Sequence, residues 1–163
     1  YEQPLPASRA GEAARAHGRD GAAIAGGWHA YPEMAAAGLW TTPTDLATWA
    51  LAIAGARTGK SNALLSKAMA ERMLTPQWEN VGLGPMLSGS GRTVGFGHGG
   101  TNAGMHCDLI YYPELGVGAA IMTNGDGGPL LIRELKRALA AEYGWPEGGA
   151  RTVTVVVIEP AQA

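Results

Sequence analysis

The feature that most constrains the fold is a pair of short β-rich runs in the second half of the chain. Residues 105–112 (MHCDLIYY) and 117–123 (VGAAIMT) are separated by Pro113 to Gly116, four residues typical of a turn. This pattern predicts a β-hairpin. Helix-forming segments lie before and after it and do not alternate with strands, so we expect an α+β fold: an antiparallel sheet packed by helices.

Three segments carry helix signals. Thr42 and Pro43 are suited to the cap and the first position of a helix that we expect to stop at Gly55. A second helix is expected from Ser66 to Thr75, ahead of Pro76. A third is expected from Pro129 to Tyr143, where large apolar residues recur four positions apart. A short helix at 8–16 and one or two strands within 77–95 complete the prediction.

Composition narrows the classes of function. The chain is 46% hydrophobic and 16% charged, which is typical of a globular protein. Its net charge of −2 and the lack of a Lys/Arg cluster argue against nucleic acid as the main partner. No apolar run approaches the ~20 residues of a membrane helix, so no span is expected. Cys107 is the single cysteine, so no intrachain disulfide can form.

The most suggestive stretch for a functional site is GFGHGGTN, residues 95–102. His98 is expected just after a strand at 93–97, and the glycines that follow allow a ligand to approach the backbone. Exposed N–H groups beside an imidazole can bind a carboxylate or an oxyanion. The alternative interpretation is that the glycines only shape a turn and that His98 is an ordinary surface side chain.

Other constellations are weaker. His106 and Asp108 share one face of the predicted strand and Cys107 takes the other, so these three cannot converge on one ion. We therefore expect no metal, and no motif indicates a cofactor. Ser-x-x-Lys, Tyr-x-Asn and Gly-x-Ser-x-Gly are all absent from the sequence. Because a serine needs a nearby base to attack at neutral pH, this chain alone is not expected to perform covalent catalysis.

Three stretches in order carry a family resemblance. They are GWHAYPEMAAAGLWTTPTDLATWALAI, GFGHGGTNAGMHCDLIYYPELGVGAAIMTNGD and the expected helix from Pro129 to Tyr143. Together they resemble the C-terminal half of the serine β-lactamase-like hydrolases, which include class C β-lactamases, penicillin-binding proteins, esterases and D-aminopeptidases. The resemblance implies a partial β-lactamase/transpeptidase-like fold. It also implies a mechanism in which a serine, activated by a lysine and a tyrosine, attacks an amide or ester carbonyl.

The resemblance also implies roles for individual residues. His98, Gly99 and Gly100 take the place of the family's Lys-Thr-Gly triplet beside the cleft, where the two glycines would border the substrate. His98 would donate to a substrate carboxylate or help position the tyrosine, and the Thr101 N–H would be one oxyanion donor. Asn102 would reach the same cleft. Histidine in place of lysine favours an esterase, a peptidase or another hydrolase over a true β-lactamase.

The same resemblance suggests how the chain is organised. Residues 1–145 are expected to be the C-terminal part of a β-lactamase-like domain, and residues 146–163 a terminal strand or a linker to a further domain. The nucleophile would belong to sequence preceding Tyr1, in a parent that is extracytoplasmic or secreted. The expected partners are a small-molecule or peptide substrate, the missing N-terminal half and another copy bound through an exposed sheet edge. A non-catalytic binding module and an inert fragment are the alternatives.

Overall fold

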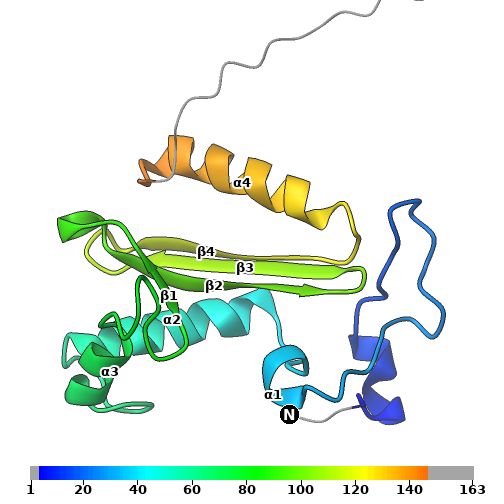
Figure 1. Cartoon of the computed structure of the whole chain (residues 1–163), viewed down its shortest axis with the longest axis horizontal. Coiled ribbons are helices and arrows are strands. Elements are labelled where there is room, and N and C mark those ends of the chain that lie inside the picture. Colours follow the sequence, from blue (N-terminus) through cyan, green and yellow to red (C-terminus); the bar gives the residue numbers. More distant parts are fainter. Residues whose placement is uncertain (1–3, 147–163) are drawn as a thin grey trace, which may run out of the picture.

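The computed structural model describes residues 4–146. Its centre is a four-stranded antiparallel sheet in the order β1-β2-β3-β4. The strands are β1 (Met86–Ser88), β2 (Gly95–Asn102), β3 (Met105–Tyr112) and β4 (Val117–Thr123). Helices α2 (Pro43–Arg57) and α3 (Lys67–Met73) lie on one side of the sheet, and α4 (Gly128–Tyr143) covers the other (Figure 1). The predicted α+β class is confirmed.

The hairpin forms where the sequence predicts it. β3 and β4 pair from His106 with Thr123 to Tyr112 with Val117, and the turn between them contains Gly116 at a positive φ of 69°. β2 and β3 are joined by a tighter turn, with Asn102 paired to Met105 and only two residues between them. One of these is Gly104, whose φ of +65° is unfavourable for residues with a side chain.

The two helices on the α2 side begin at their predicted caps. The Thr42 hydroxyl oxygen accepts a hydrogen bond from the Asp45 nitrogen at 3.1 Å, and Ser66 accepts one from Met69 at 3.2 Å. The predicted stop of α2 at Gly55 is wrong. The helix continues to Arg57 because Ala56 is buried in its last turn, and the left-handed residue that follows is Gly59.

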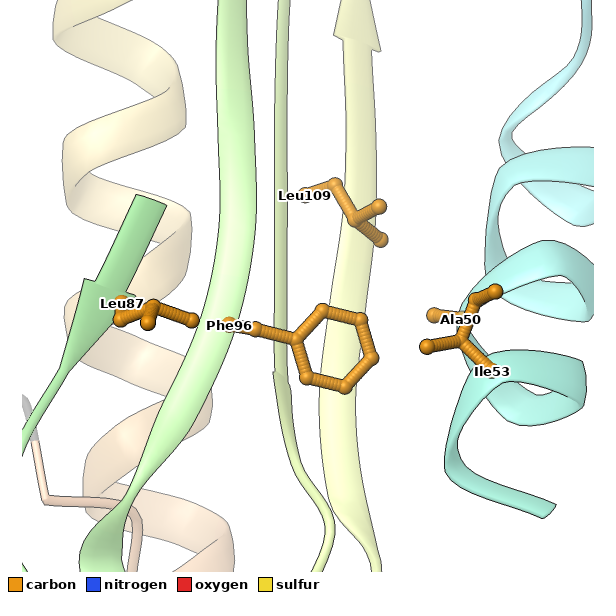
Figure 2. Packing of buried hydrophobic residues seen from close by; sticks show 5 residues of the cluster. All are labelled: Ala50, Ile53, Leu87, Phe96 and Leu109. Carbon is orange, nitrogen blue, oxygen red and sulfur yellow. The ribbon is translucent and has the colours of Figure 1, made fainter. Parts of the chain in front are cut away.

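A hydrophobic core joins α2 to the sheet. Phe96 points from β2 toward the helix (Figure 2). Its ring meets Trp49 and Tyr111 edge-on at centroid separations of 6.3 and 5.9 Å. The buried residues of this cluster are Ala50, Ile53, Leu87, Phe96 and Leu109. Fully burying one such large side chain contributes about 1.5–3 kcal/mol, so this layer fixes which face of β2 and β3 points toward α2.

A second core joins α4 to the opposite face of the sheet. Its buried members are Ile110, Tyr112, Ala140 and Trp145. The leucine spacing predicted the helix correctly, but of that stripe only Leu139 packs against this core. Leu131 is 53% exposed and Tyr143 is 63% exposed, whereas Ile132 is buried. The small Ala140 lets α4 approach the strands on a different face of the helix.

The N-terminal segment is mostly irregular. The helix expected at 8–16 is a 3₁₀ helix, η1 (Ala7–Glu12), followed by a short α1 (Met34–Ala37). The region 77–95 yields β1 and a second 3₁₀ turn, η2 (Gly91–Thr93). Within residues 4–146 no helix has the length and apolar character needed to cross a bilayer. Beyond Pro146, the predicted terminal strand or linker lies outside the described residues.

Candidate functional site

His98 lies in the middle of a strand. The predicted strand end at Gly97 is wrong, because every residue of β2 from Phe96 to Asn102 pairs with a residue of β3. The glycine run is therefore extended backbone rather than a bend. A regular strand presents its peptide groups at fixed intervals, so this result changes how the candidate site is built.

Half of β2 is a free edge. On the side away from β3, β1 pairs only with the first three residues, Gly95 to Gly97. From His98 onward, no strand among residues 4–146 covers that side. The polar backbone groups of this part of β2 are thus available to a ligand, as the HGG hypothesis requires.

The direction of the Thr101 N–H follows from the ladder. The Leu87 nitrogen donates to the Asn80 carbonyl at 2.7 Å, so the backbone N–H of Leu87 points away from its partner in β2, Phe96. Peptide directions alternate along antiparallel strands, so Gly97 turns its N–H toward β1. The N–H groups of Gly99 and Thr101, two and four residues later, point to the same side as that of Gly97, but they lie beyond the end of β1. The Thr101 N–H therefore faces the free edge.

The His98 side chain is exposed, and its own strand orients it. Its Nδ1 lies 2.5 Å from the Gly99 carbonyl oxygen. A carbonyl oxygen only accepts hydrogen bonds, so Nδ1 carries the hydrogen. In a neutral imidazole Nε2 is then the acceptor.

The two candidate glycines differ in their surroundings. A Cβ at Gly100 would lie 2.7 Å from Cys107 Sγ, whereas one at Gly99 would have its nearest neighbour at 3.6 Å. The packing of Cys107 is enough to explain why residue 100 is glycine. Packing does not explain the glycine at position 99, because a Cβ there would make only ordinary van der Waals contacts.

Asn102 is held by the N-terminal segment. Its Nδ2 donates to the Ala37 carbonyl at 3.0 Å, and the Tyr31 hydroxyl accepts from the Ala103 nitrogen at 2.9 Å. These two bonds fix the end of β2 and the segment around α1 to each other. Asn102 is the last residue of β2, and its side-chain amide nitrogen is already engaged by the Ala37 carbonyl.

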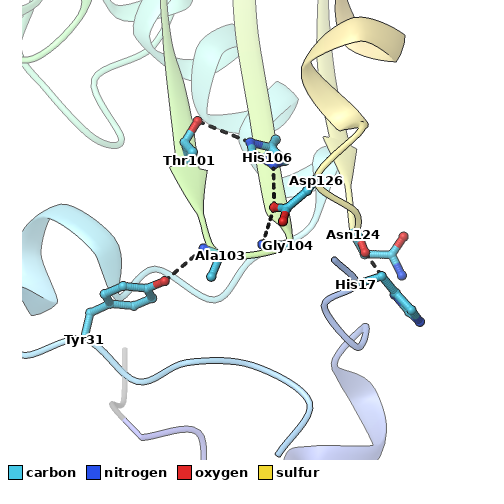
Figure 3. A network of polar contacts seen from close by, with 8 residues as sticks. All are labelled: His17, Tyr31, Thr101, Ala103, Gly104, His106, Asn124 and Asp126. Atoms are coloured by element: carbon cyan, nitrogen blue, oxygen red, sulfur yellow. Dashed lines mark hydrogen bonds and ion pairs between the residues drawn. The ribbon is translucent and has the colours of Figure 1, made fainter. Parts of the chain in front are cut away.

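A polar network that sequence reasoning missed lies on the α4 face of the same strand. His106 Nδ1 is 3.3 Å from the Thr101 hydroxyl oxygen, and its Nε2 is 3.5 Å from an Asp126 carboxylate oxygen (Figure 3). That oxygen also accepts from the Gly104 nitrogen at 2.8 Å. His106 lies opposite Thr101 in the pairing of β2 with β3, which was not predicted because the strand before His98 was expected to end at Gly97.

The same face contains a cavity of about 480 Å³ between the sheet and α4. Thr101 and His106 line it from the strands, and Ile132 and Arg133 line it from the helix. The lining is completed by Gly99, Gly100, Cys107, Asp108, Pro129, Lys136 and Arg137. The volume lies within the ~300–1,000 Å³ of small-molecule pockets.

The residues considered for a metal do not converge. His106 and Asp108 lie on the α4 face and Cys107 on the α2 face, as the alternation predicts. Among the described residues there is no group of three His, Cys, Asp or Glu side chains placed to hold an ion. Burial raises the pKa of the Cys107 thiol, and the Asp108 charge raises it further.

Comparison with known proteins agrees with this architecture. Residues 2–142 match the sequence family described as Beta-lactamase. The chain belongs to the beta-lactamase family. This is a family of serine hydrolases, so the hydrolase resemblance inferred from the three sequence stretches is confirmed at that level.

Two solved structures show the same fold for this beta-lactamase family chain. The crystal structure of SurE with D-Leu is 29% identical with a TM-score of 0.54, and the match covers 73% of this chain and 30% of that one. A second SurE structure is 25% identical with a TM-score of 0.52, covering 91% and 35%. The chain thus spans about a third of their length. No curated protein matches it.

Proposed function

We propose that this chain supplies the oxyanion strand of a serine hydrolase that cleaves an amide or an ester. The carrying observation is the free edge of β2, the part from His98 onward that no other strand among residues 4–146 pairs with on the side away from β3. The Thr101 N–H and the His98 imidazole both belong to this part of the strand. A backbone N–H held rigidly in a sheet needs no reorganisation when negative charge develops on the substrate carbonyl oxygen. The nucleophile of the proposed site lies outside this chain.

His98 would act as a base in this proposal. With its hydrogen on Nδ1, a neutral His98 has an unprotonated Nε2 that can accept a proton from a tyrosine or serine hydroxyl. The resemblance instead implied that His98 donates to a substrate carboxylate or helps position a tyrosine, and donation from Nε2 requires the protonated ring. Gly99 would leave room for the substrate backbone, and Asn102 would keep the end of the strand in place through Ala37.

Possible substrates are a β-lactam, a D-amino acid peptide or a carboxylic ester. SurE has been crystallised with D-Leu, and this relative supports testing substrates that contain a D-amino acid. The free strand edge fits such a substrate, because an extended peptide can add to it by main-chain hydrogen bonds.

The test compares the 163-residue chain with the longest polypeptide encoded in the same reading frame. Nitrocefin, D-leucine p-nitroanilide and p-nitrophenyl acetate serve as substrates. We expect hydrolysis by the longer polypeptide only, and His98→Ala should lower kcat about a hundredfold, in the range for losing a general base. His29→Ala, which changes another exposed histidine, is the matched control.

Two results would contradict the proposal. Hydrolysis by the 163-residue chain alone would show that the nucleophile is within it. A longer polypeptide that binds these substrates without cleaving them, with binding lost in His98→Ala, would instead support a non-catalytic binding module.

A further inference from the structure

We propose that the cavity between the sheet and α4 is a second binding site, for a small molecule that carries both an anionic group and a hydrogen-bond donor. The site lies on the α4 face of β2, whereas the His98 side chain lies on the α2 face. It goes beyond the proposed hydrolysis and would exist whether or not the parent cleaves an amide or an ester.

The helix wall of the cavity provides the positive charge. It contributes Arg133, Lys136 and Arg137, against one lining carboxylate, that of Asp108. Lys136 Nζ lies 3.0 Å from Asp108, and Arg137 forms an ion pair with Glu134. In the part of the chain that the structure describes, Arg133 forms no ion pair. Its guanidinium is therefore the group that an incoming carboxylate would meet.

The strand wall provides a hydrogen-bond acceptor, and the network of Figure 3 fixes its polarity. His106 Nε2 is buried without a hydrogen-bond partner, and the Asp126 carboxylate oxygen lies 3.5 Å from it. Because that carboxylate can only accept, we assign the hydrogen of the neutral ring to Nε2. In the neutral ring Nδ1 then accepts, and the Thr101 hydroxyl must donate to it. The Thr101 oxygen is left with lone pairs only, so it presents an acceptor to the cavity.

This acceptor is well fixed in place. The His106 side chain is 8% exposed, and the Gly104 amide holds the Asp126 carboxylate beside the imidazole. The helix wall also contributes Ile132 and Pro129 to the lining, and these side chains suit an aliphatic group. A ligand with a carboxylate, an amine and an aliphatic body, such as a branched amino acid, combines the three features.

The binding test uses three probes of similar size on the full 163-residue chain. Leucine of either hand has both groups, 4-methylpentanoate lacks the amine and 3-methylbutylamine lacks the carboxylate. We expect leucine to bind most tightly by calorimetry and to shift the amide signals of Gly99 and Thr101. Arg133→Gln should weaken leucine and 4-methylpentanoate about tenfold, the size of one charge-assisted hydrogen bond, without affecting the amine.

Matched variants separate polarity from folding. Thr101→Val should weaken leucine and 3-methylbutylamine, and Thr101→Ser should restore both because it keeps the hydroxyl. Arg92→Gln, which removes an exposed arginine of η2 outside the cavity, should change nothing. No saturable binding of leucine, or binding that survives Arg133→Gln unchanged, would overturn the proposal.

A spectroscopic test needs no ligand and reads the network directly. In ¹⁵N-histidine-labelled chain, we expect His106 with its hydrogen on Nε2 and an Nδ1 signal that changes in Thr101→Val but not in Thr101→Ser. Asp126→Asn should abolish the preference for this tautomer. A ring found with its hydrogen on Nδ1 would show that Thr101 presents a donor, and the assigned ligand class would be wrong.

Discussion

The glycines of β2 differ in what a side chain would meet at each position. A Cβ at Gly97 would collide with the carbonyl group of Leu109 on the paired strand, which is backbone and cannot rotate away. At Gly99 the nearest atom would be the Cys107 carbonyl oxygen at 3.6 Å. One glycine thus keeps the sheet paired, and the other leaves the edge and the cavity open.

This difference gives a prediction for stability. Gly97→Ala should destabilise the fold by about 1–3 kcal/mol, the usual cost of overpacking, because β2 must separate from β3 beside His98. Urea unfolding followed by tryptophan fluorescence measures it. Gly99→Ala is the control and should change stability by much less. Equal midpoints for the two variants would mean that the strands can separate without cost.

Cys107 gives a prediction of pH dependence. Burial, and then the charge of Asp108, raise its thiol pKa, so at a given pH less of it is the reactive thiolate than in a free thiol. Alkylation by iodoacetamide should be slow at pH 8 and should keep rising at pH values where N-acetylcysteine has levelled off. Asp108→Asn should shift the pH dependence of alkylation part of the way toward that of N-acetylcysteine. A profile that superimposes on that of N-acetylcysteine would refute this assignment.

At the scale of elements, helix starts depend on side-chain caps and helix faces depend on packing. Thr42 and Ser66 each accept a hydrogen bond from the backbone three residues on, and both were evident from sequence. The buried face of α4 was not evident. Ile132 and Ala140 face the sheet, while the more conspicuous Leu131 and Leu135 are exposed.

The cap of α2 can be tested. Thr42→Ala should lower the free energy of unfolding by about 1 kcal/mol, because it leaves the Asp45 N–H without its acceptor. Thr44→Ala, two residues later and exposed in the same helix, should have a much smaller effect. Thermal unfolding by circular dichroism compares them. If both variants unfold alike, the cap contributes nothing to α2.

At the scale of the whole molecule, β4 forms an edge of the sheet. It has no partner beyond β3 among the described residues, and Val117–Thr123 contains neither a charge nor a proline. Natural edge strands usually carry such residues, since an unprotected edge pairs with other strands. Exposed leucines of α4 add to the apolar surface of this chain.

We therefore expect the isolated chain to self-associate through β4. Light scattering after gel filtration should show a mass that increases with concentration. Met122→Lys should return the chain to the monomer, because a charged residue on an edge strand opposes pairing with another strand. Leu51→Lys is the control: it places the same charge on the exposed face of α2 and should leave the self-association unchanged. A concentration-independent monomer would contradict this expectation.

The local features of this fold follow from sequence alone. The hairpin, its turn and the caps of α2 and α3 depend on interactions between residues a few positions apart, so the side chains that determine them are adjacent in the sequence. The strand that carries His98 was located, although its end was misplaced. Ala16 and His17 contact Gly104 across the molecule, and no pattern near either segment predicts that approach.

Only the tertiary structure decided what surrounds the candidate site. Asp126 reaches His106 because β4 returns beside β3, and His106 meets Thr101 because β3 pairs with β2. The face of α4 that lines the cavity is likewise set by how closely small residues let the helix pack. These placements depend on packing between segments distant along the chain, and such packing energies depend on the whole fold rather than on neighbouring residues.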